Sequence, residues 1–239
     1  MQSIKFDNFS CYYKSKKQYI TILDKLTFEI NGGEFFVVVG ESGCGKTTLL
    51  KSILGLMDYV DGDLHIDGVA IDDFDIKSAN IGYVKQEIAL YPHLTVYENI
   101  AFPLRTMHTP QAEVDKRVKE IAKLLDIDWL LTRKPKQLSG GQHQRIAIAR
   151  AMVKNPQAVL FDEPFSNIDS SLRGEMRQLV RRIHETYHIT TIFVTHDLDE
   201  AFILADRIMV LNKGRLEDIG TPDELRQNCR SELLKGYIE

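Results

Sequence analysis

The sequence contains few cysteines, no long apolar run and no excess of basic residues. Its three cysteines, Cys11, Cys44 and Cys229, are too scattered for a disulfide framework or a metal site. The longest apolar runs, such as FFVVV at Phe35–Val39, are far shorter than the roughly 20 residues of a membrane-spanning helix. The first ten residues lack the apolar core of a signal peptide. We therefore expect a reduced, cytosolic chain.

The charge balance gives no support to a nucleic-acid partner. Lysine and arginine together number 30 against 34 acidic residues, for a net charge of -4, whereas nucleic-acid-binding domains usually carry a basic excess. Hydrophobic residues make up 44% of the 239 residues, which is enough for a substantial core. We expect a single domain over residues 1–239 that binds no nucleic acid.

Strand-like apolar runs alternate with helical segments along much of the chain. The runs FFVVV, AVLF, TTIFVT and RIMVL are separated by helical segments that include residues 46–56 and 170–187. This alternation predicts an α/β fold with a mostly parallel sheet covered by helices. Residues 1–30 are rich in β-forming residues and predict an antiparallel β portion. Residues 95–153 are rich in helix formers and predict a helical subdomain inserted into the α/β core.

The segment GESGCGKT, residues 40–47, has the phosphate-loop pattern G-x-x-x-x-G-K-[ST] between a strand-like run and a helical one. Its glycines let the backbone approach an anion, and successive N–H groups at the helix N-terminus bind phosphate. Lys46 should reach the outer phosphates of a nucleoside triphosphate, and Thr47 should ligate Mg²⁺. The context disfavours a plain surface loop. The residues predicted to contact the nucleotide here are Gly40, Glu41, Ser42, Gly43, Cys44, Gly45, Lys46, Thr47 and Thr48.

Two carboxylates and a histidine stand at the ends of later strand-like runs. Asp162 and Glu163 follow AVLF, and His196 follows the run that ends at Thr195. Since parallel strands end at the same edge of a sheet, these side chains should lie beside the phosphate loop. Asp162 would hold Mg²⁺, Glu163 would polarise the attacking water, and His196 would contact the γ-phosphate. The alternatives are a solvated strand end for the carboxylates and a structural role for the histidine.

A second glycine-rich segment, LSGGQHQR at residues 138–145, has no lysine. The phosphate loop, AVLFDE and LSGGQ, in this order, resemble the ATP-binding cassette family over essentially the whole chain, and LSGGQ is the specific element. The resemblance implies that two cassettes pair head to tail, with each ATP between the phosphate loop of one and the signature loop LSGGQ of the other. The signature residues that would contact this ATP are Ser139, Gly140, Gly141 and Gln142.

The resemblance extends to further residues. Gln86, in GYVKQE, resembles the glutamine that senses Mg²⁺, which makes Thr47, Gln86 and Asp162 the expected metal ligands. Tyr13 is the candidate for stacking on adenine, with the adjacent Tyr12 as the alternative. The segment SNID, residues 166–169, resembles the one that crosses the dimer interface, although Asn167 and Ile168 stand where alanine and leucine are commoner. No role follows for His143, which stands where glutamine, lysine or arginine is usual.

Residues 91–105 and 195–225 are similar to cassettes of bacterial importers of sugars, polyamines and ferric iron. The resemblance implies a homodimer, or a pair with a paralogous cassette, at the cytoplasmic face of the cell membrane. Its partners would be separate transmembrane permease subunits and an extracytoplasmic substrate-binding protein. A regulatory domain often follows the cassette in this branch, and a chain that stops at Glu239 is expected to lack one. Ile88, Leu90 and Tyr91 form either a groove for a permease helix or ordinary core.

Two other functions stay open. One is a soluble ATPase of this family that acts outside transport, such as a chromosome or repair ATPase head. The absence of a sustained heptad pattern disfavours it, because such heads carry long coiled-coil arms. The other is an ATP-gated module that dimerises without turnover, and the presence of both Glu163 and His196 argues against it.

Overall fold

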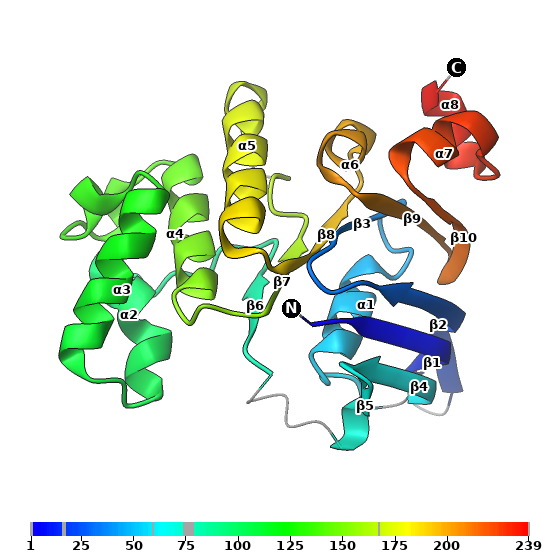
Figure 1. Ribbon diagram of the computed structural model, residues 1–239, viewed down its shortest axis with the longest axis horizontal. Coiled ribbons are helices and arrows are strands. Elements are labelled where there is room, and N and C mark those ends of the chain that lie inside the picture. Colours follow the sequence, from blue (N-terminus) through cyan, green and yellow to red (C-terminus); the bar gives the residue numbers. More distant parts are fainter. Residues whose placement is uncertain (1, 16–17, 59, 74–78, 167, 239) are drawn as a thin grey trace.

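The computed structural model describes residues 2–15, 18–58, 60–73, 79–166 and 168–238, and two β-sheets form its framework. The larger sheet has the strand order β10-β9-β3-β8-β7-β6 (Figure 1). Strands β9, β3, β8, β7 and β6 are parallel, whereas β10 pairs antiparallel with β9. The bounds of these strands are β3 (Phe35–Val39), β6 (Ile81–Val84), β7 (Ala158–Asp162), β8 (Thr190–Thr195), β9 (Arg207–Asn212) and β10 (Arg215–Gly220).

The central strands are buried on both faces. Every residue of β3, β7 and β8 is buried, as expected for parallel strands that are covered on either side. Alternate side chains of β3 therefore enter two separate cores. Phe35 and Val37 pack into the core that includes α5 and α6, whereas Phe36 and Val38 pack into the core that includes α1 and the smaller sheet.

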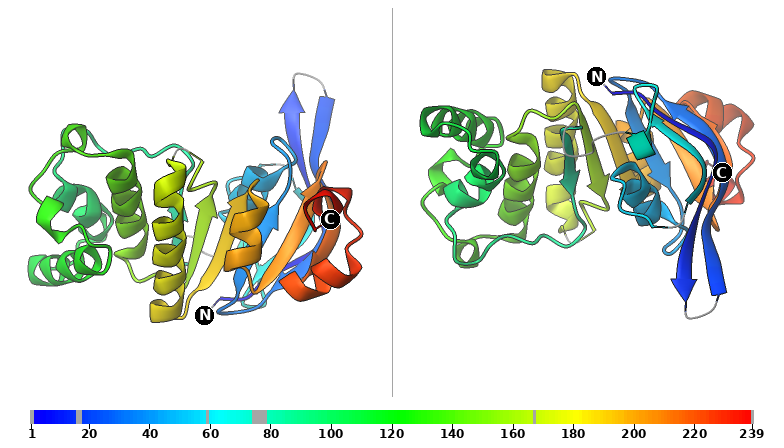
Figure 2. Two further views of the ribbon diagram at one scale, coloured as in Figure 1. Left: turned by 90° about the horizontal axis from the view of Figure 1, so that it is seen from above. Right: turned by 90° about the horizontal axis from the view of Figure 1, so that it is seen from below.

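The smaller sheet is antiparallel and has the strand order β2-β1-β4-β5. One end of the hairpin formed by β1 and β2 extends away from the rest of the fold (Figure 2). The other end lies against the larger sheet, where Phe6, Phe28 and Phe36 stack in succession at centroid distances of 4.6 and 5.8 Å. The strand bounds are β1 (Ile4–Ser15), β2 (Gln18–Ile30), β4 (Val60–Ile66) and β5 (Val69–Ala70).

Helices cover both faces of the larger sheet. Helices α5 (Ser170–Tyr187) and α6 (Leu198–Leu204) lie on one face, and α1 (Lys46–Ile53) lies on the other (Figure 1). Two short helices, α7 (Pro222–Asn228) and α8 (Glu232–Ile238), follow β10. No helix in the described part of the chain is long and apolar enough to cross a membrane.

Three further helices gather at the end of the molecule beyond β6 (Figure 1). They are α2 (Val96–Thr106), α3 (Gln111–Leu124) and α4 (Gly140–Met152). Helix α2 begins with a capping box in which Thr95 and Glu98 exchange hydrogen bonds. Single turns of 3₁₀ helix are formed by Ile71–Asp73, Asp128–Leu130 and Pro135–Gln137.

The structure confirms the predicted fold class: a mostly parallel sheet covered by helices and preceded by an antiparallel β portion. The first helix is shorter than the predicted residues 46–56, because it ends at Ile53. Gly55 then adopts a left-handed φ of 61°, and its N–H donates to Ser52, which is a common way for a helix to end. The sequence pattern did not reveal β4, β6, β10, α7 or α8.

Candidate active site

The phosphate loop connects the end of β3 to the start of α1. Gly45 precedes the first helical residue with φ at 114°, a conformation that L side chains rarely adopt, and a Cβ there would lie 2.8 Å from Leu23. At Gly40, a Cβ would lie 2.2 Å from the carbonyl oxygen of Leu211 in β9. Glycine at these two positions is therefore required for the loop to lie against its neighbours. In a loop of this kind, successive N–H groups can face an anion.

Lys46, the first residue of α1, is held inside this loop. Its side chain is 4% exposed, and its Nζ donates to the carbonyl oxygens of Gly40 at 2.8 Å and Glu41 at 3.0 Å. The same Nζ lies 3.3 Å from Oε1 of Glu163, beyond the end of β7. A buried ammonium group is thus placed at the point where the phosphate loop meets the predicted catalytic carboxylate.

Asp162 is the last residue of β7, and its two carboxylate oxygens accept hydrogen bonds from different elements. Thr47 Oγ1 donates to Oδ1 at 2.9 Å, and the phenol of Tyr83 in β6 donates to Oδ2 at 3.1 Å. Burial raises the pKa of Asp162 above its ordinary value, and the two hydroxyl donors oppose that rise. The sequence did not single out Tyr83, since its role depends on β6 lying beside β7.

Glu163 continues from β7 with a left-handed φ of 43°, which is uncommon for a residue with a side chain. Strained backbone of this kind often occurs at functional positions. Its N–H donates to the carbonyl of Val194 in β8, and its Oε2 lies 3.0 Å from Nδ1 of His196 at the tip of that strand. The carboxylate therefore stands between the imidazole of His196 and the ammonium of Lys46.

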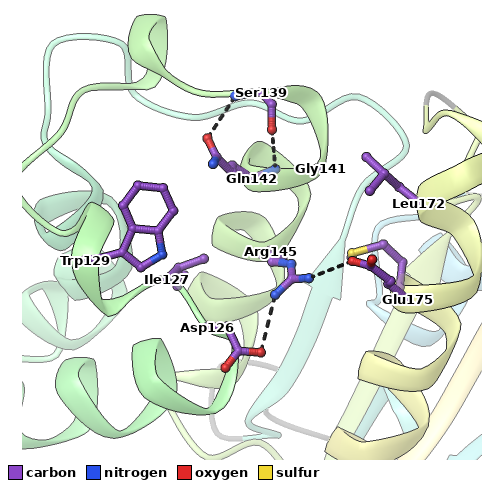
Figure 3. A pocket seen from close by; sticks show the side chains of 10 residues that line it. Asp126, Ile127, Trp129, Ser139, Gly141, Gln142, Arg145, Leu172 and Glu175 are labelled. Carbon is purple, nitrogen blue, oxygen red and sulfur yellow. Dashed lines mark hydrogen bonds and ion pairs between the residues drawn. The ribbon is translucent and has the colours of Figure 1, made fainter.

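The signature loop lies elsewhere, at the N-terminus of α4. Ser139 caps this helix: its Oγ accepts from Gln142 N at 3.4 Å, and its own N–H donates to Gln142 Oε1 at 3.0 Å. Gly140 and Gly141 form the first helical positions. Figure 3 shows Ser139, Gly141 and Gln142 lining a pocket with Trp129, and with Leu172 and Glu175 of α5 on its opposite side.

The structure does not bring the two glycine loops together. β7 and α5 separate α4 from α1 in Figures 1 and 2. Within the described ranges, no hydrogen bond or ion pair joins residues 138–145 to residues 40–48. Each loop therefore has an open face of its own.

Several other residues predicted to contact nucleotide or Mg²⁺ are exposed or half-buried. Tyr13, in the protruding part of β1, is 62% exposed and faces Ile20 across the hairpin, whereas Tyr12 is half-buried. Gln86 is exposed and follows β6 by two residues. Within the phosphate loop, the exposed residues are Glu41, Ser42 and Gly43; Thr48 is half-buried and accepts a bond from Ser52.

Several positions left open by the sequence are clarified by their contacts. His143 Nε2 lies 2.9 Å from the carbonyl oxygen of Pro135, which ties α4 to the turn before it. Ile88 and Leu90 pack against the core, while Tyr91 remains at the surface, where its ring contacts that of Phe102 in a tilted arrangement with the centroids 4.7 Å apart. In the segment 166–169, Ile168 is 6% exposed, and Asn167 lies outside the described residues.

Cys44 is buried at the back of the phosphate loop. Its side chain is 7% exposed, and its carbonyl accepts a hydrogen bond from Gly214 in the turn between β9 and β10. Burial raises the pKa of the Cys44 thiol, and the neighbouring Lys46 opposes that rise. The thiol is therefore a packed and mainly protonated group, although it lies within the loop.

The chain is similar to known proteins of one family. Residues 23–166 match the family model described as ABC transporter. The chain is 44% identical over 225 residues to the trehalose/maltose import ATP-binding protein of Thermococcus litoralis, covering 92% of this chain and 60% of that protein. It is 47% identical over 217 residues to an sn-glycerol-3-phosphate import ATP-binding protein of Chromobacterium violaceum, covering 91% and 59%. The chain thus spans about three fifths of the length of the curated relatives it matches.

A solved structure has the same fold over almost its whole length. It is a dimeric, post-hydrolysis state of an ATP-binding cassette bound to ADP and phosphate, with a TM-score of 0.81 and 34% identity, covering 92% of this chain and 98% of that one. Together with the family match over more than half of the chain, this likeness shows that the protein belongs to the ABC transporter family and has the fold of its ATP-binding cassettes.

Proposed function

We propose that the protein is the ATP-hydrolysing subunit of an ABC importer. The observation that carries this proposal is the meeting of Lys46, at the start of α1, with Glu163 and His196, which follow strands β7 and β8. Glu163 lies 3.3 Å from Lys46 Nζ and 3.0 Å from His196 Nδ1. A cation that binds phosphate, a carboxylate that can orient water and a histidine beside it are groups suited to hydrolysis of a γ-phosphate.

Each residue then has a defined part in turnover. The N–H groups of the phosphate loop and Lys46 bind and orient the triphosphate. Glu163 orients and polarises the attacking water, and His196 hydrogen-bonds both Glu163 and the γ-phosphate, so that the two stay aligned. Tyr13 supplies an exposed aromatic face for adenine.

The residues around Asp162 fit a bound Mg²⁺. A hydroxyl and a carboxylate are ligands of the kind that this ion prefers, and Thr47 Oγ1 and Asp162 Oδ1 lie 2.9 Å apart. Gln86 would add an amide oxygen. When bound, Mg²⁺ neutralises part of the phosphate charge. Tyr83 would keep the second carboxylate oxygen of Asp162 turned away from the phosphate loop.

The signature loop supports a dimer as the active form. Ser139, Gly140 and Gly141 stand at the N-terminus of a 13-residue helix, which favours anions, yet the phosphate loop of the same chain is remote. A second copy, or a paralogous cassette, placed head to tail would bring each signature loop to the other chain's ATP. Closure around two ATP molecules would then be driven by their higher affinity for the closed state.

Import is the transport direction named for the relatives. On that basis, the dimer would bind permease subunits at the cytoplasmic face of the membrane and receive cargo from an extracytoplasmic binding protein. Tyr91, which is 37% exposed and follows Gln86 by five residues, is an aromatic residue available to contact a permease helix.

Purification of the tagged chain from membranes, followed by a phosphate-release assay, tests this function. We expect Mg²⁺-dependent ATP hydrolysis and recovery of polytopic membrane subunits in fixed ratio. A Tyr91→Ala variant should hydrolyse ATP normally but lose those subunits. Hydrolysis without any membrane partner would instead support an ATPase outside transport. ATP-dependent dimerisation without phosphate release would support a gating module.

Cys44 provides a further prediction about nucleotide access. A bulky thiol reagent should inactivate ATP hydrolysis slowly, because the buried thiol reacts only as its thiolate and during local opening. The inactivation rate should rise about tenfold per pH unit while the pH stays below the raised pKa, and bound ATP should protect. Cys44→Ser should be resistant, whereas Cys229→Ser should match the parent. Equal inactivation of Cys44→Ser and the parent would place the sensitive group elsewhere.

A further inference from the structure

Arg173, in the first turn of α5, contacts two loops that both lead to the active site. Its Nε donates to the carbonyl oxygen of Ile168 at 3.2 Å, within the segment 166–169. Its Nη1 lies 3.4 Å from Oδ2 of Asp197, the residue after His196. A guanidinium group can make both contacts at once because its N–H donors form a rigid, planar fork.

On one side, the contact reaches a tightly bonded turn around His196. The N–H of Asp197 donates to Thr195 Oγ1 at 3.0 Å, and Thr195 Oγ1 donates to the buried carboxylate of Glu200 at 2.6 Å. Asp197 Oδ1 accepts from the N–H of Glu200 in the first turn of α6, so Asp197 caps this helix. The two neighbours of His196, Thr195 and Asp197, are therefore both held by hydrogen bonds. Arg173 contacts Asp197, the more exposed of the two.

On the other side, the contact reaches the loop that starts at Glu163. Ser166 donates to the Glu163 carbonyl through its N–H at 3.3 Å and through its Oγ at 3.0 Å. Ile168 then follows in the same loop. Since Glu163 Oε2 also meets His196 Nδ1 at 3.0 Å, the contacts form a closed ring from Glu163 through Ile168, Arg173 and Asp197 to His196.

We propose that Arg173 is a positioning residue that couples Ile168 to His196 and so keeps the Glu163–His196 pair aligned. The inference rests on the proposed function, in which that pair serves ATP hydrolysis. Arg173 is 35% exposed, and ion pairs at such exposure contribute little to stability. Its loss should therefore change alignment much more than folding.

The chain contains a matched control on the same helix. Arg181 is 36% exposed, donates to the carbonyl of Leu204 at 3.0 Å and lies 3.3 Å from Asp206, but it contacts neither loop. Arg181 also pairs with Glu185 at 2.9 Å and lies over the Phe35 ring. Arg181→Ala thus removes at least as many contacts as Arg173→Ala, at a distance from the site. Arg173→Lys keeps the charge but cannot hold both acceptors in one plane, so it should resemble Arg173→Ala.

Two measurements test the inference. In steady-state kinetics, Arg173→Ala should lower kcat about tenfold, a typical size for loss of coupling between sites, with KM for ATP within about twofold. In a His196→Ala background, the same change should lower kcat less than about twofold, because the residue acts through His196. An undiminished tenfold loss in that background, or equal effects of Arg173→Ala and Arg181→Ala, would overturn it.

Amide hydrogen exchange gives a readout that needs no turnover. Arg173→Ala should speed exchange at Asp197 and Ile168, whereas Arg181→Ala should leave both unchanged. If Arg173→Ala speeds exchange relative to the parent but the parent itself releases no phosphate, the coupling stands and the proposed function is rejected. If the parent hydrolyses ATP and Arg173→Ala leaves exchange at both positions unchanged, the coupling is rejected and the proposed function stands.

Discussion

Replacing Glu163 with glutamine should lower ATP turnover by about 100-fold or more, which is the scale of a lost general base. This corresponds to about 2.7 kcal/mol in the activation free energy. Glutamine preserves the size of the side chain and its position beside Lys46 and His196, so the phosphate loop should still bind ATP. The ATP-bound dimer should therefore persist longer, and size-exclusion chromatography with ATP should detect it alongside a steady-state phosphate assay.

Glu34 offers the control for this substitution. It is a buried carboxylate paired with Arg207 at 3.2 Å, and it precedes β3 at the opposite end of the strand from the phosphate loop. Glu34→Gln removes a paired charge without touching the site, so turnover per folded molecule should stay near that of the parent. Near-normal hydrolysis by Glu163→Gln would show that another group activates the water.

Mixing two inactive variants should restore activity if the signature loop acts across a dimer interface. Lys46→Ala removes the phosphate-binding cation, and Ser139→Arg fills the signature loop, so each homodimer should be nearly inactive. In a mixed dimer, one composite site carries both defects and the other has none. After random exchange of equal amounts, about half of the dimers are mixed, and we expect about a quarter of the parental turnover.

The same experiment separates action between chains from action within one chain. A signature loop serving its own phosphate loop would leave both sites of every mixed dimer defective, and no activity would return. Differential tags should confirm that mixed dimers form, and ATP-dependent dimerisation should be scored with hydrolysis, since the two sites can be coupled. Unchanged dimerisation and turnover in Ser139→Arg would contradict the proposed contact between chains.

The parts of the fold that the sequence predicts well are those with continuous burial. Strands β3 and β7 consist mostly of apolar residues, and β8 joins three apolar residues with β-branched threonines. All three strands are buried on both faces, and their sequence pattern carries that signal directly. By contrast, β4 has the sequence VDGDLHI and buries only Leu64 and Ile66. Helices α7 and α8 bury one residue each, so their apolar periodicity is too weak to recognise.

The same distinction applies to the site. Lys46, Asp162 and Glu163 lie in short motifs whose spacing reflects a strand followed by a turn, and His196 repeats that arrangement. Tyr83 and Arg173 lie in no such motif. Their roles arise because β6 pairs with β7 and because α5 begins beside two loops, and neither neighbour is encoded locally. Motif spacing therefore predicts the candidate groups for contact with substrate but not the residues proposed to orient them.

Trp129 lines the pocket beside the signature loop, is 59% exposed, and is the single tryptophan of the chain. The chain thus carries an intrinsic fluorophore at the face where a second cassette would approach. Its emission reports the polarity around one known position, without a label and without interference from other indoles. Arrival and departure of the partner can consequently be followed in real time by stopped-flow fluorescence, separately from the release of phosphate.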